Sequence, residues 1–359
     1  MSAAPVMIVA GGTGGHVFPA LAVAETLTGR GVPVVWLGTP HGLEARVVPA
    51  AGISLVTVGV RGLRGNGLGG WLAAPWMVAR AVAACRRALR RHRPGMMLGM
   101  GGYVAGPAGL AARWQGCPLV IHEQNAIPGL TNRLLARLAR RTLTGLDAAF
   151  PGRVPVTGTG NPVRGEIAAL PAPETRYAGR SGKPRLLVIG GSLGARQLNR
   201  CVPAALAQLP PGRRPEVLHQ AGTRTLDAAR QAYAEAGVEA SVQPFIEDMA
   251  AAYAWCDLAI CRAGALTVSE LAAAGVPALL VPYPHAVDDH QRANAAYLVS
   301  AGAAELIDDA ALGSDVLGER LDALLADRAH LLGMAAAARA RGRPDAAEVV
   351  ADICLEVAA

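Results

Sequence analysis

Met7-Ile-Val-Ala-Gly-Gly-Thr-Gly-Gly15 is the stretch that decides the fold of this 359-residue chain. Its apolar half predicts a buried strand, and its glycine-rich half predicts a tight turn before a helix. A similar stretch, Leu187-Val-Ile-Gly-Gly-Ser-Leu-Gly-Ala195, stands at the head of the second half. Because strand and helix patterns alternate after each copy, we expect an α/β protein with two parallel sheets, each covered by helices on both faces.

The other strand and helix patterns extend outward from these two stretches. We expect strands at 6–10, 33–37, 53–58, 96–98, 119–122, 185–189, 217–219, 258–261 and 278–281, and helices notably at 17–28, 71–91 and 130–139. Pro162 keeps Asn161 out of a helix, which puts a domain boundary there. The predicted domains are 1–161 and 162–340, with residues 169–184 as a surface loop. The ligand site is expected in a cleft between the sheets, beyond the carboxyl ends of the strands.

The composition excludes several classes of protein. With 52% hydrophobic and 17% charged residues, the chain can fill sizeable cores and is not disordered. The most apolar window, 71–85, is too short for a membrane span and contains Arg80, and the first ten residues lack the basic start of a secretory signal. Six scattered cysteines without a C-x-x-C pair indicate free, buried thiols in a reducing cytosol.

Charge is distributed unequally between the two halves. Residues 1–163 hold 16 arginines and four acidic residues, a net charge of +12, whereas residues 164–359 hold 18 basic and 23 acidic residues, a net charge of −5. The first half therefore favours an anionic partner, which would be phosphate, an acidic membrane surface or nucleic acid. Nothing resembling a DNA-reading helix or an aromatic stacking platform supports nucleic acid.

The turn 11–15 lets a ligand approach the backbone closely, and the helix after it offers free N–H groups and the positive end of its dipole. It is not a dinucleotide fingerprint, because Val17 occupies the third glycine position and no acid follows Leu37-Gly-Thr39 to hold a ribose. It is not a P-loop either. His16, at the helix start, is either a general base or a capping or packing histidine, and the sequence leaves both readings open.

Two further glycine-rich loops precede helical patterns. Leu98-Gly-Met-Gly-Gly-Tyr-Val-Ala-Gly106 indicates either a second anion site or a close contact between helix and strand. The loop 190–196 adds the hydroxyl of Ser192 as a donor and helix cap.

A third helix start follows the strand expected at 258–261. Gly264 and Ala265 are expected to open this helix. Glu270 then either accepts hydrogen bonds from a ribose diol or serves as the capping-box partner of Thr267.

Polar residues cluster at two other places. His122-Glu-Gln-Asn125 ends a strand, a position that usually faces a site in an α/β sheet. His285, Asp288, Asp289 and His290 could be taken for metal ligands. A helix starting near Asp288 explains the two acids as first-turn partners of its dipole, so the sequence favours no metal.

The helix predicted at 71–91 combines aromatic and apolar residues with a basic end. Its apolar part includes Trp71, Leu72, Trp76 and Met77, followed by Arg80 and further arginines, and a second basic cluster comprises Arg133, Arg137, Arg140 and Arg141. This composition suits an anionic membrane interface. The alternative is an amphipathic helix whose tryptophans pack against their own sheet.

Eight segments together resemble one family, the bacterial UDP-GlcNAc transferases that form lipid II in peptidoglycan synthesis (the MurG family). In chain order they are 11–19, 62–65, 98–106, 122–125, 160–164, 190–196, 265–270 and 289–294. Any one is weak, but the ordered set is specific. The resemblance implies a GT-B fold, in which two Rossmann-like domains face each other across a cleft and a last helix, 341–359, returns to the N-terminal domain. It also implies an inverting transfer without metal or cofactor.

The resemblance further implies the substrates and the residues that bind them. The donor is UDP-GlcNAc, and the acceptor is lipid I, undecaprenyl-diphosphate-linked N-acetylmuramyl pentapeptide, at the cytoplasmic face of the membrane. Carried over to this sequence, the donor site comprises Ile246 for uracil, Glu270 for ribose, Ser192 and the helix residues Ala265, Leu266, Thr267, Val268 and Ser269 around the diphosphate, Gln291 and Asn125 for the sugar, and Thr13, Gly14, Gly15 and Arg164 to complete it.

On the acceptor side, His16 is the hypothesised base, and Gly101, Gly102 and Tyr103 are expected to bind the acceptor diphosphate. Trp71, Leu72, Trp76 and Arg80 would form a patch against the anionic inner membrane surface. The resemblance also admits other cell-wall synthesis proteins as partners.

Two other functions stay open. One is a different UDP-sugar enzyme on the same architecture, such as a UDP-GlcNAc epimerase, which the Trp/Arg helix disfavours because a soluble sugar needs no membrane patch. The other is a non-catalytic binder of a lipid diphosphate, which release of UDP would exclude. A nicotinamide dehydrogenase is disfavoured by the missing third glycine and ribose acid.

Overall fold

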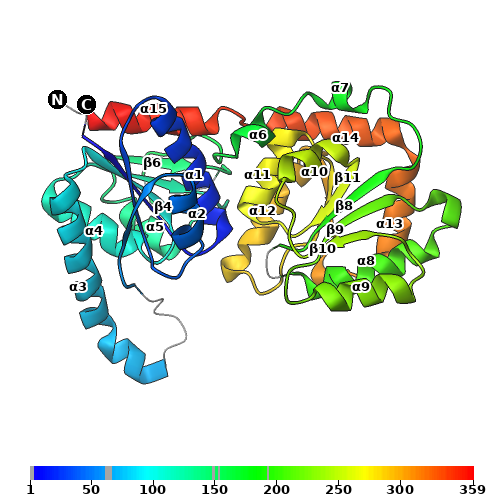
Figure 1. Cartoon of the computed structure of the whole chain (residues 1–359), viewed down its shortest axis with the longest axis horizontal. Helices are drawn as coiled ribbons and strands as arrows, with labels where there is room; N and C mark the ends of the chain where they lie inside the picture. The colour runs from blue at the N-terminus through cyan, green and yellow to red at the C-terminus, as the bar shows by residue number, and fades with distance from the viewer. Residues whose placement is uncertain (1–3, 61–66, 148–149, 153, 192–193) are drawn as a thin grey trace. The chain divides into compact units, whose positions relative to one another are not determined.

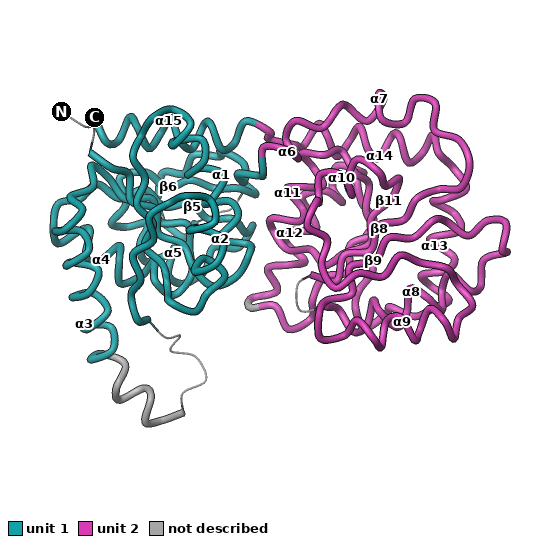
Figure 2. The backbone as a smooth tube through the Cα atoms, in the orientation of Figure 1, with its two compact units in different colours: residues 1–164, 345–359 teal, residues 165–344 magenta. Residues whose placement is uncertain are grey.

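The computed structural model describes residues 4–60, 67–147, 150–152, 154–191 and 194–359. The chain divides into two compact units, which Figure 2 colours teal and magenta. Unit 1 comprises Met1–Arg164 and Asp345–Ala359, and unit 2 comprises Gly165–Pro344. The boundary between the units thus lies close to the one expected from Pro162. Each unit contains one parallel sheet, which confirms the predicted α/β class.

Unit 1 is built on a seven-stranded sheet in the order β3-β2-β1-β4-β5-β6-β7. Its strands are β1 (Val6–Ala10), β2 (Val34–Gly38), β3 (Ser54–Thr57), β4 (Met96–Gly101), β5 (Leu119–Glu123), β6 (Arg141–Thr144) and β7 (Thr157–Gly158). Its helices are α1 (Gly14–Gly29), α2 (Glu44–Ala50), α3 (Gly67–His92), α4 (Ala105–Gln115), α5 (Leu130–Leu135) and α15 (Ala346–Ala358).

The central strand β1 is apolar throughout because helices cover both faces of the sheet. Val6 and Ile8 share one core with α1 and α15, and Met7 and Val9 share the other with α3 and α4. Helix α15 follows unit 2 in the sequence, yet its Val350 and Cys354 complete the first of these cores (Figure 1). The described residues include no helix that is both long and apolar enough to cross a membrane.

Unit 2 repeats the arrangement with a six-stranded sheet in the order β10-β9-β8-β11-β12-β13. Its strands are β8 (Arg185–Ile189), β9 (Glu216–Gln220), β10 (Ser241–Gln243), β11 (Leu258–Cys261), β12 (Ala278–Leu280) and β13 (Ala304–Leu306). Its helices are α6 (Gly165–Ala168), α7 (Pro173–Tyr177), α8 (Arg196–Gln208), α9 (Leu226–Glu235), α10 (Met249–Trp255), α11 (Ala265–Ala274), α12 (His290–Val299), α13 (Ser314–Ala326) and α14 (Arg328–Arg341), with single 3₁₀ turns at Pro211–Arg213, Val287–Asp289 and Asp309–Ala311.

Both sheets start at a central strand, add strands on one side and then cross to the other. The strand order therefore reverses between β1 and β4 in unit 1, and between β8 and β11 in unit 2. Ligands of open parallel sheets bind outside the carboxyl ends of the strands at such a reversal. In each unit, the glycine-rich turn after the first strand lies at this point.

Most strands lie where the sequence predicts them, and β1, β8 and β11 match to the residue. The short strands β6, β7, β10 and β13 were not predicted, and the helix expected at 130–139 ends at Leu135. The cysteines are free as expected: five are buried, and Cys117 is half-buried.

The expectation of a surface loop at 169–184 is wrong in its central part. Residues Pro173–Tyr177 form α7, and the side chains around it bind backbone carbonyls of unit 2. Arg176 donates to the carbonyls of Tyr253 (3.0 Å) and Gly275 (2.6 Å), and Tyr177 Oη donates to the carbonyl of Asp257 (2.7 Å). Hydrogen bonds from this segment, called the strap below, therefore cap the C-terminal ends of α10 and α11. The sequence gives no local signal for the strap because its partners are distant in the chain.

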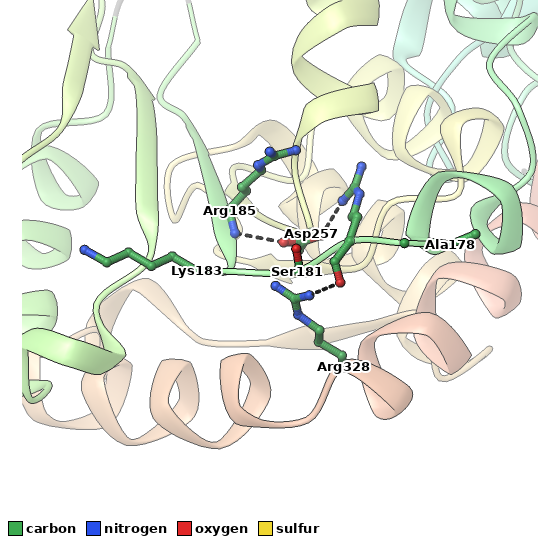
Figure 3. Close-up of a pocket in the computed structure, with 8 residues that line it drawn as sticks. Ala178, Ser181, Lys183, Arg185, Asp257 and Arg328 are labelled. Carbon is green, nitrogen blue, oxygen red and sulfur yellow. Dashed lines mark hydrogen bonds and ion pairs between the residues drawn. The ribbon is translucent and has the colours of Figure 1, made fainter.

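A cavity of about 230 Å³ lies beside this strap, where basic side chains gather near the starts of β8 and β11 (Figure 3). Two of the cations, Arg180 and Arg328, are engaged with the protein. Arg180 pairs with the buried carboxylate of Asp257, and Arg328 donates to the carbonyls of Arg180 (2.5 Å) and Gly182 (2.8 Å). The backbone N–H of Arg185 also donates to Asp257, at 2.9 Å. We therefore interpret these contacts as structural, because they hold the chain around Arg180–Arg185 to the rest of unit 2.

Candidate functional site

Two glycine-rich turns touch at the carboxyl ends of β1 and β4 in unit 1. A Cβ atom on Gly102 would lie 2.3 Å from the carbonyl oxygen of Gly11, and Gly102 has a φ of +83°. A Cβ on Gly101 would lie 2.3 Å from Cδ2 of His16. Only glycine fits at these two positions, because both the space and the backbone angle exclude a side chain. The sequence allowed a close contact between helix and strand at this loop, and the structure contains one where His16 of α1 packs on Gly101, the last residue of β4.

His16 lies in the first turn of α1, which begins at Gly14 rather than at the expected residue 17. The backbone N–H groups of His16 and Val17 donate to the carbonyl of Thr13, at 3.1 and 3.2 Å. The first N–H groups of a helix lack partners within it, so this helix start can donate to a ligand. The half-buried His16 ring packs on Gly101, which brings the hypothesised base and the second glycine turn together.

Glu44 is a functional candidate that the sequence analysis missed. No acid follows β2 directly, but the first residue of α2 reaches back to the end of that strand. Its fully buried carboxylate accepts hydrogen bonds from the N–H of Gly12 (3.0 Å) and from the N–H (2.9 Å) and hydroxyl (2.6 Å) of Thr39. Burial by itself would raise the pKa of Glu44, but these hydrogen bonds outweigh it and leave the pKa below its usual value.

The cluster 122–125 was expected to face a site, and for its first three residues this is wrong. His122, Glu123 and Gln124 are buried. Gln124 Nε2 donates to the carbonyl of Met100 (2.9 Å), which ties the end of β5 to β4. The Glu123 carboxylate accepts from the backbone N–H of Asn125 (2.9 Å) and from its Nδ2 (3.1 Å). Asn125 itself is half-buried at this same edge of the sheet, held in place by Glu123.

Two more of the predicted site residues, Arg164 and Tyr103, lie in unit 1. The Arg164 guanidinium lies over the ring of Phe18 in α1, 5.5 Å from its centroid. This contact brings Arg164 to the first turns of the helix that carries His16. Tyr103, after the second glycine turn, is 62% exposed and therefore accessible to a ligand.

In unit 2, α11 begins directly after β11, with Gly264 as its N-cap. Thr267 is thus the third helical residue, so the capping-box alternative for Glu270 is wrong. Glu270 is buried, and Tyr253 Oη donates to its Oε2 at 3.1 Å. Ala265, Val268 and Ser269 are buried, whereas Leu266 and Thr267 are half-buried. The helix start and Glu270 lie beyond the carboxyl end of β11, where a ligand is expected.

Ile246 and Gln291 lie at the ends of two strands, β9 and β12, which β8 and β11 separate in the sheet. The backbone N–H of Ile246 donates to Oε1 of Gln220, the last residue of β9, at 2.9 Å. Gln291 Oε1 accepts from the backbone N–H of Tyr283 at 2.9 Å, so the side chain is held beside the segment after β12. Ser192 lies outside the described residues.

The segment before α12 differs from the expectation. The helix begins at His290, and Asp288 and Asp289 precede it with φ values of +54° and +50°. These acids are therefore not in the first turn of the helix. Among the described residues, no three His, Cys, Asp or Glu side chains gather in a group that could hold a metal ion.

The predicted membrane patch lies on α3, whose residues Trp71 and Leu72 belong to the part with undescribed side chains. Trp76 is 73% exposed, so the alternative in which it packs against its own sheet is wrong. One exposed stripe of α3 continues from it at helical spacing through Arg80, Ala83, Arg87 and Arg90. Helix α4, which packs on α3, adds the exposed Trp114, and α5, which packs on α4, adds the exposed Leu130 and Leu134.

Two parallel sheets, each with a reversal of strand order, are the elements of the GT-B fold, and comparison with known proteins establishes that fold and the family. The model of the glycosyltransferase family 28 N-terminal domain matches residues 6–144, and that of the C-terminal domain matches residues 185–350. The chain therefore belongs to glycosyltransferase family 28.

Several relatives are similar over their whole length. A protein of Alkalilimnicola ehrlichii named UDP-N-acetylglucosamine--N-acetylmuramyl-(pentapeptide) pyrophosphoryl-undecaprenol N-acetylglucosamine transferase is 62% identical and covers 99% of each chain. A protein of the same name from Halorhodospira halophila is 58% identical, over 100% of this chain and 99% of that one. The crystal structure of Acinetobacter baumannii MurG is 41% identical, with a TM-score of 0.83 over 98% of this chain and 99% of that one.

The two buried histidines give the free energy of unfolding a defined pH dependence. Burial lowers the pKa of His122 to about 4, and burial likewise lowers the pKa of His219 to about 4. Both stay neutral in the folded protein while the unfolded chain takes up protons near pH 6.5. Stability is therefore complete above pH 6.5 and falls as the pH is lowered toward 4. At pH 5.5, each histidine should lower the free energy of unfolding, measured by urea denaturation, by about 1 kcal/mol.

His122→Gln should reduce the loss of unfolding free energy between pH 7.5 and 5.5 by the contribution of His122. This difference between the two pH values does not depend on how the substitution changes the stability at pH 7.5. His330→Gln is the matched control, because His330 is exposed on α14. Equal slopes between pH 7.5 and 5.5 in the wild type and His122→Gln would contradict the assignment.

Proposed function

We propose that this protein transfers N-acetylglucosamine from UDP-GlcNAc to lipid I and so forms lipid II for peptidoglycan synthesis. The observation that carries the proposal is identity along the whole chain. Relatives with the name quoted above are 62%, 58% and 54% identical over at least 98% of this chain. Fold alone would not decide it, since a UDP-GlcNAc 2-epimerase from Neisseria meningitidis has a TM-score of 0.70 at only 14% identity.

The donor nucleotide is assigned to unit 2. The start of α11 offers backbone N–H groups and a positive dipole end to a diphosphate, with Ala265, Leu266 and Thr267 in its first turn and Ser192 as a further donor. Glu270 would accept hydrogen bonds from the two ribose hydroxyls. The hydrogen bond from Tyr253 helps to orient its carboxylate. Ile246 would contact uracil through its backbone, and Gln291 and Asn125 would contact the sugar.

The acceptor is assigned to unit 1, where the net positive charge and the second glycine turn suit a lipid-linked diphosphate at Gly101, Gly102 and Tyr103. His16 would take the proton from the acceptor hydroxyl while that oxygen attacks the anomeric carbon and the bond to UDP breaks. One such displacement inverts the anomeric centre. The helix start in unit 2, with Thr13, Gly14, Gly15 and Arg164 from unit 1, would stabilise the charge that develops on the diphosphate.

The direct test is a sugar-transfer assay with radiolabelled UDP-GlcNAc and a lipid I analogue. We expect labelled lipid II analogue and one UDP released per sugar transferred, with the same rate in the presence of EDTA because helix dipoles and Arg164 stand in for a cation. Conversion of UDP-GlcNAc to its epimer without transfer would contradict the proposal. Binding of the acceptor without release of UDP would contradict it as well.

His16→Ala tests the assignment of the base. Loss of a general base should lower kcat about 10²- to 10⁴-fold with both substrates saturating. The affinity for UDP, measured by calorimetry, should stay within about twofold because the nucleotide is assigned to unit 2. Near-normal turnover of His16→Ala would show that another group takes the proton.

We further propose that the exposed stripe of α3 binds the anionic inner membrane surface, which places the protein at the cytoplasmic face. The support is local: Trp76 and three arginines share one exposed face of the helix, and α4, which packs on α3, adds the exposed Trp114. An aromatic residue followed by basic residues suits the boundary between headgroups and acyl chains. Other cell-wall synthesis proteins remain proposed partners on the basis of the resemblance alone.

Sedimentation with phosphatidylglycerol vesicles tests this surface. Each basic residue near an anionic surface contributes about 1 kcal/mol, so Arg80→Ala should weaken vesicle binding about fivefold at low salt. Trp76→Ala combined with Arg80→Ala should weaken it further, and binding should fall as salt is raised. Arg224→Ala, an exposed arginine of unit 2, is the matched control. Binding that is indifferent to salt and to these variants would refute the patch.

A further inference from the structure

The carboxylate of Glu44 occupies a site that several glycines make possible. Cβ atoms would lie 2.6 Å from its Oε1 at Gly11 and 2.7 Å from its Cγ at Gly38. A Cβ at Gly42 would come even closer to the carboxylate. The turns after β1 and β2 therefore enclose the carboxylate, and a side chain at any of the three positions would displace it. Such a buried anion is retained only where hydrogen bonds satisfy it, as Gly12 and Thr39 do here.

The hydrogen bond from Gly12 connects this carboxylate to His16. Gly12 has a φ of +96°, and its N–H is fixed by Glu44. The next residue, Thr13, accepts the backbone N–H of His16, yet its own side chain makes no capping hydrogen bond. The first turn of α1 contains no acid of its own. The conformation of the turn that leads into His16 therefore depends on a side chain from another helix.

We propose that Glu44 is a positioning residue: it holds the turn 11–13 and, through it, the His16 ring against Gly101. The inference rests on the proposed function, because it assigns His16 to the transfer. It adds a residue that does not touch substrate and that acts only on the geometry of unit 1. Since catalysis depends on near-ångström placement of the reacting groups, a loosened turn should lower turnover rather than nucleotide affinity.

Glu44→Gln tests the proposal, because an amide of the same shape cannot accept hydrogen bonds from both Gly12 and Thr39. We expect kcat to fall between about 10- and 100-fold at a temperature where the variant stays folded. The affinity for UDP should stay within about twofold of the wild type. Hydrogen exchange of the amides of residues 12–16 should become faster, while exchange in α11 of unit 2 should not change.

Thr39 supplies a milder series in case Glu44→Gln does not fold. Thr39→Val removes one donor to Oε1 and should lower kcat in the same direction, and Thr39→Ser, which keeps the hydroxyl, should restore most of it. Glu348→Gln, an exposed acid on α15 of the same unit, is the matched control and should behave as the wild type.

Three results would overturn the inference. They are an unchanged kcat in Glu44→Gln, unchanged exchange at residues 12–16, or a loss of UDP affinity in parallel with kcat, which would indicate general damage. If the wild type transferred no sugar, the proposed function would fail, but the exchange measurement would still decide whether Glu44 holds the turn.

Discussion

The turns after β1 and β4 can touch because Gly102 carries no side chain, and this contact organises the first unit. The carbonyl of Gly11 fills the space where a side chain on Gly102 would be, so the loops after β1 and β4 form one surface. His16 packs on that surface, and the Glu44 carboxylate lies against Gly11 and accepts the N–H of Gly12. The strand order reverses between β1 and β4, so the contact lies where open parallel sheets bind ligands.

In unit 2, different contacts hold the corresponding glycine-rich turn and the helix after β11. In the described part of this glycine-rich turn, a Cβ on Gly194 would lie 2.4 Å from the carbonyl of Ala221, the residue after β9. Helix α11 is held at its C-terminal end, where Arg176 and Arg339 donate to its last carbonyls. Cations at this end complement the helix dipole and leave the opposite, positive end available for a phosphate. The two units share a topology, but each holds its ligand-facing loop by its own polar contacts.

Strands β1, β8 and β11 could be predicted to the residue because each is an apolar run bounded by turn signals, whereas β4, expected at 96–98, extends to Gly101. The short strands were missed because a stretch such as Ala304–Leu306, with Glu305 in the middle, has no distinctive pattern. Local motifs were sufficient for the glycine turns and for the start of α11. They failed where the partner is remote in sequence: Glu44 lies beyond the end of β2, and Arg176 and Tyr177 bind elements some 80 to 100 positions away.

Helix α15 makes the first unit discontinuous in the chain, with Val350 and Cys354 packed beside Val6 and Ile8. During synthesis, residues 1–164 leave the ribosome without the helix that covers one side of their core. The second unit is contiguous and can complete its own core first. The first unit must therefore wait, with apolar surface uncovered, until residues 346–358 emerge, which makes it the part of the nascent chain with the greater need for protection from aggregation.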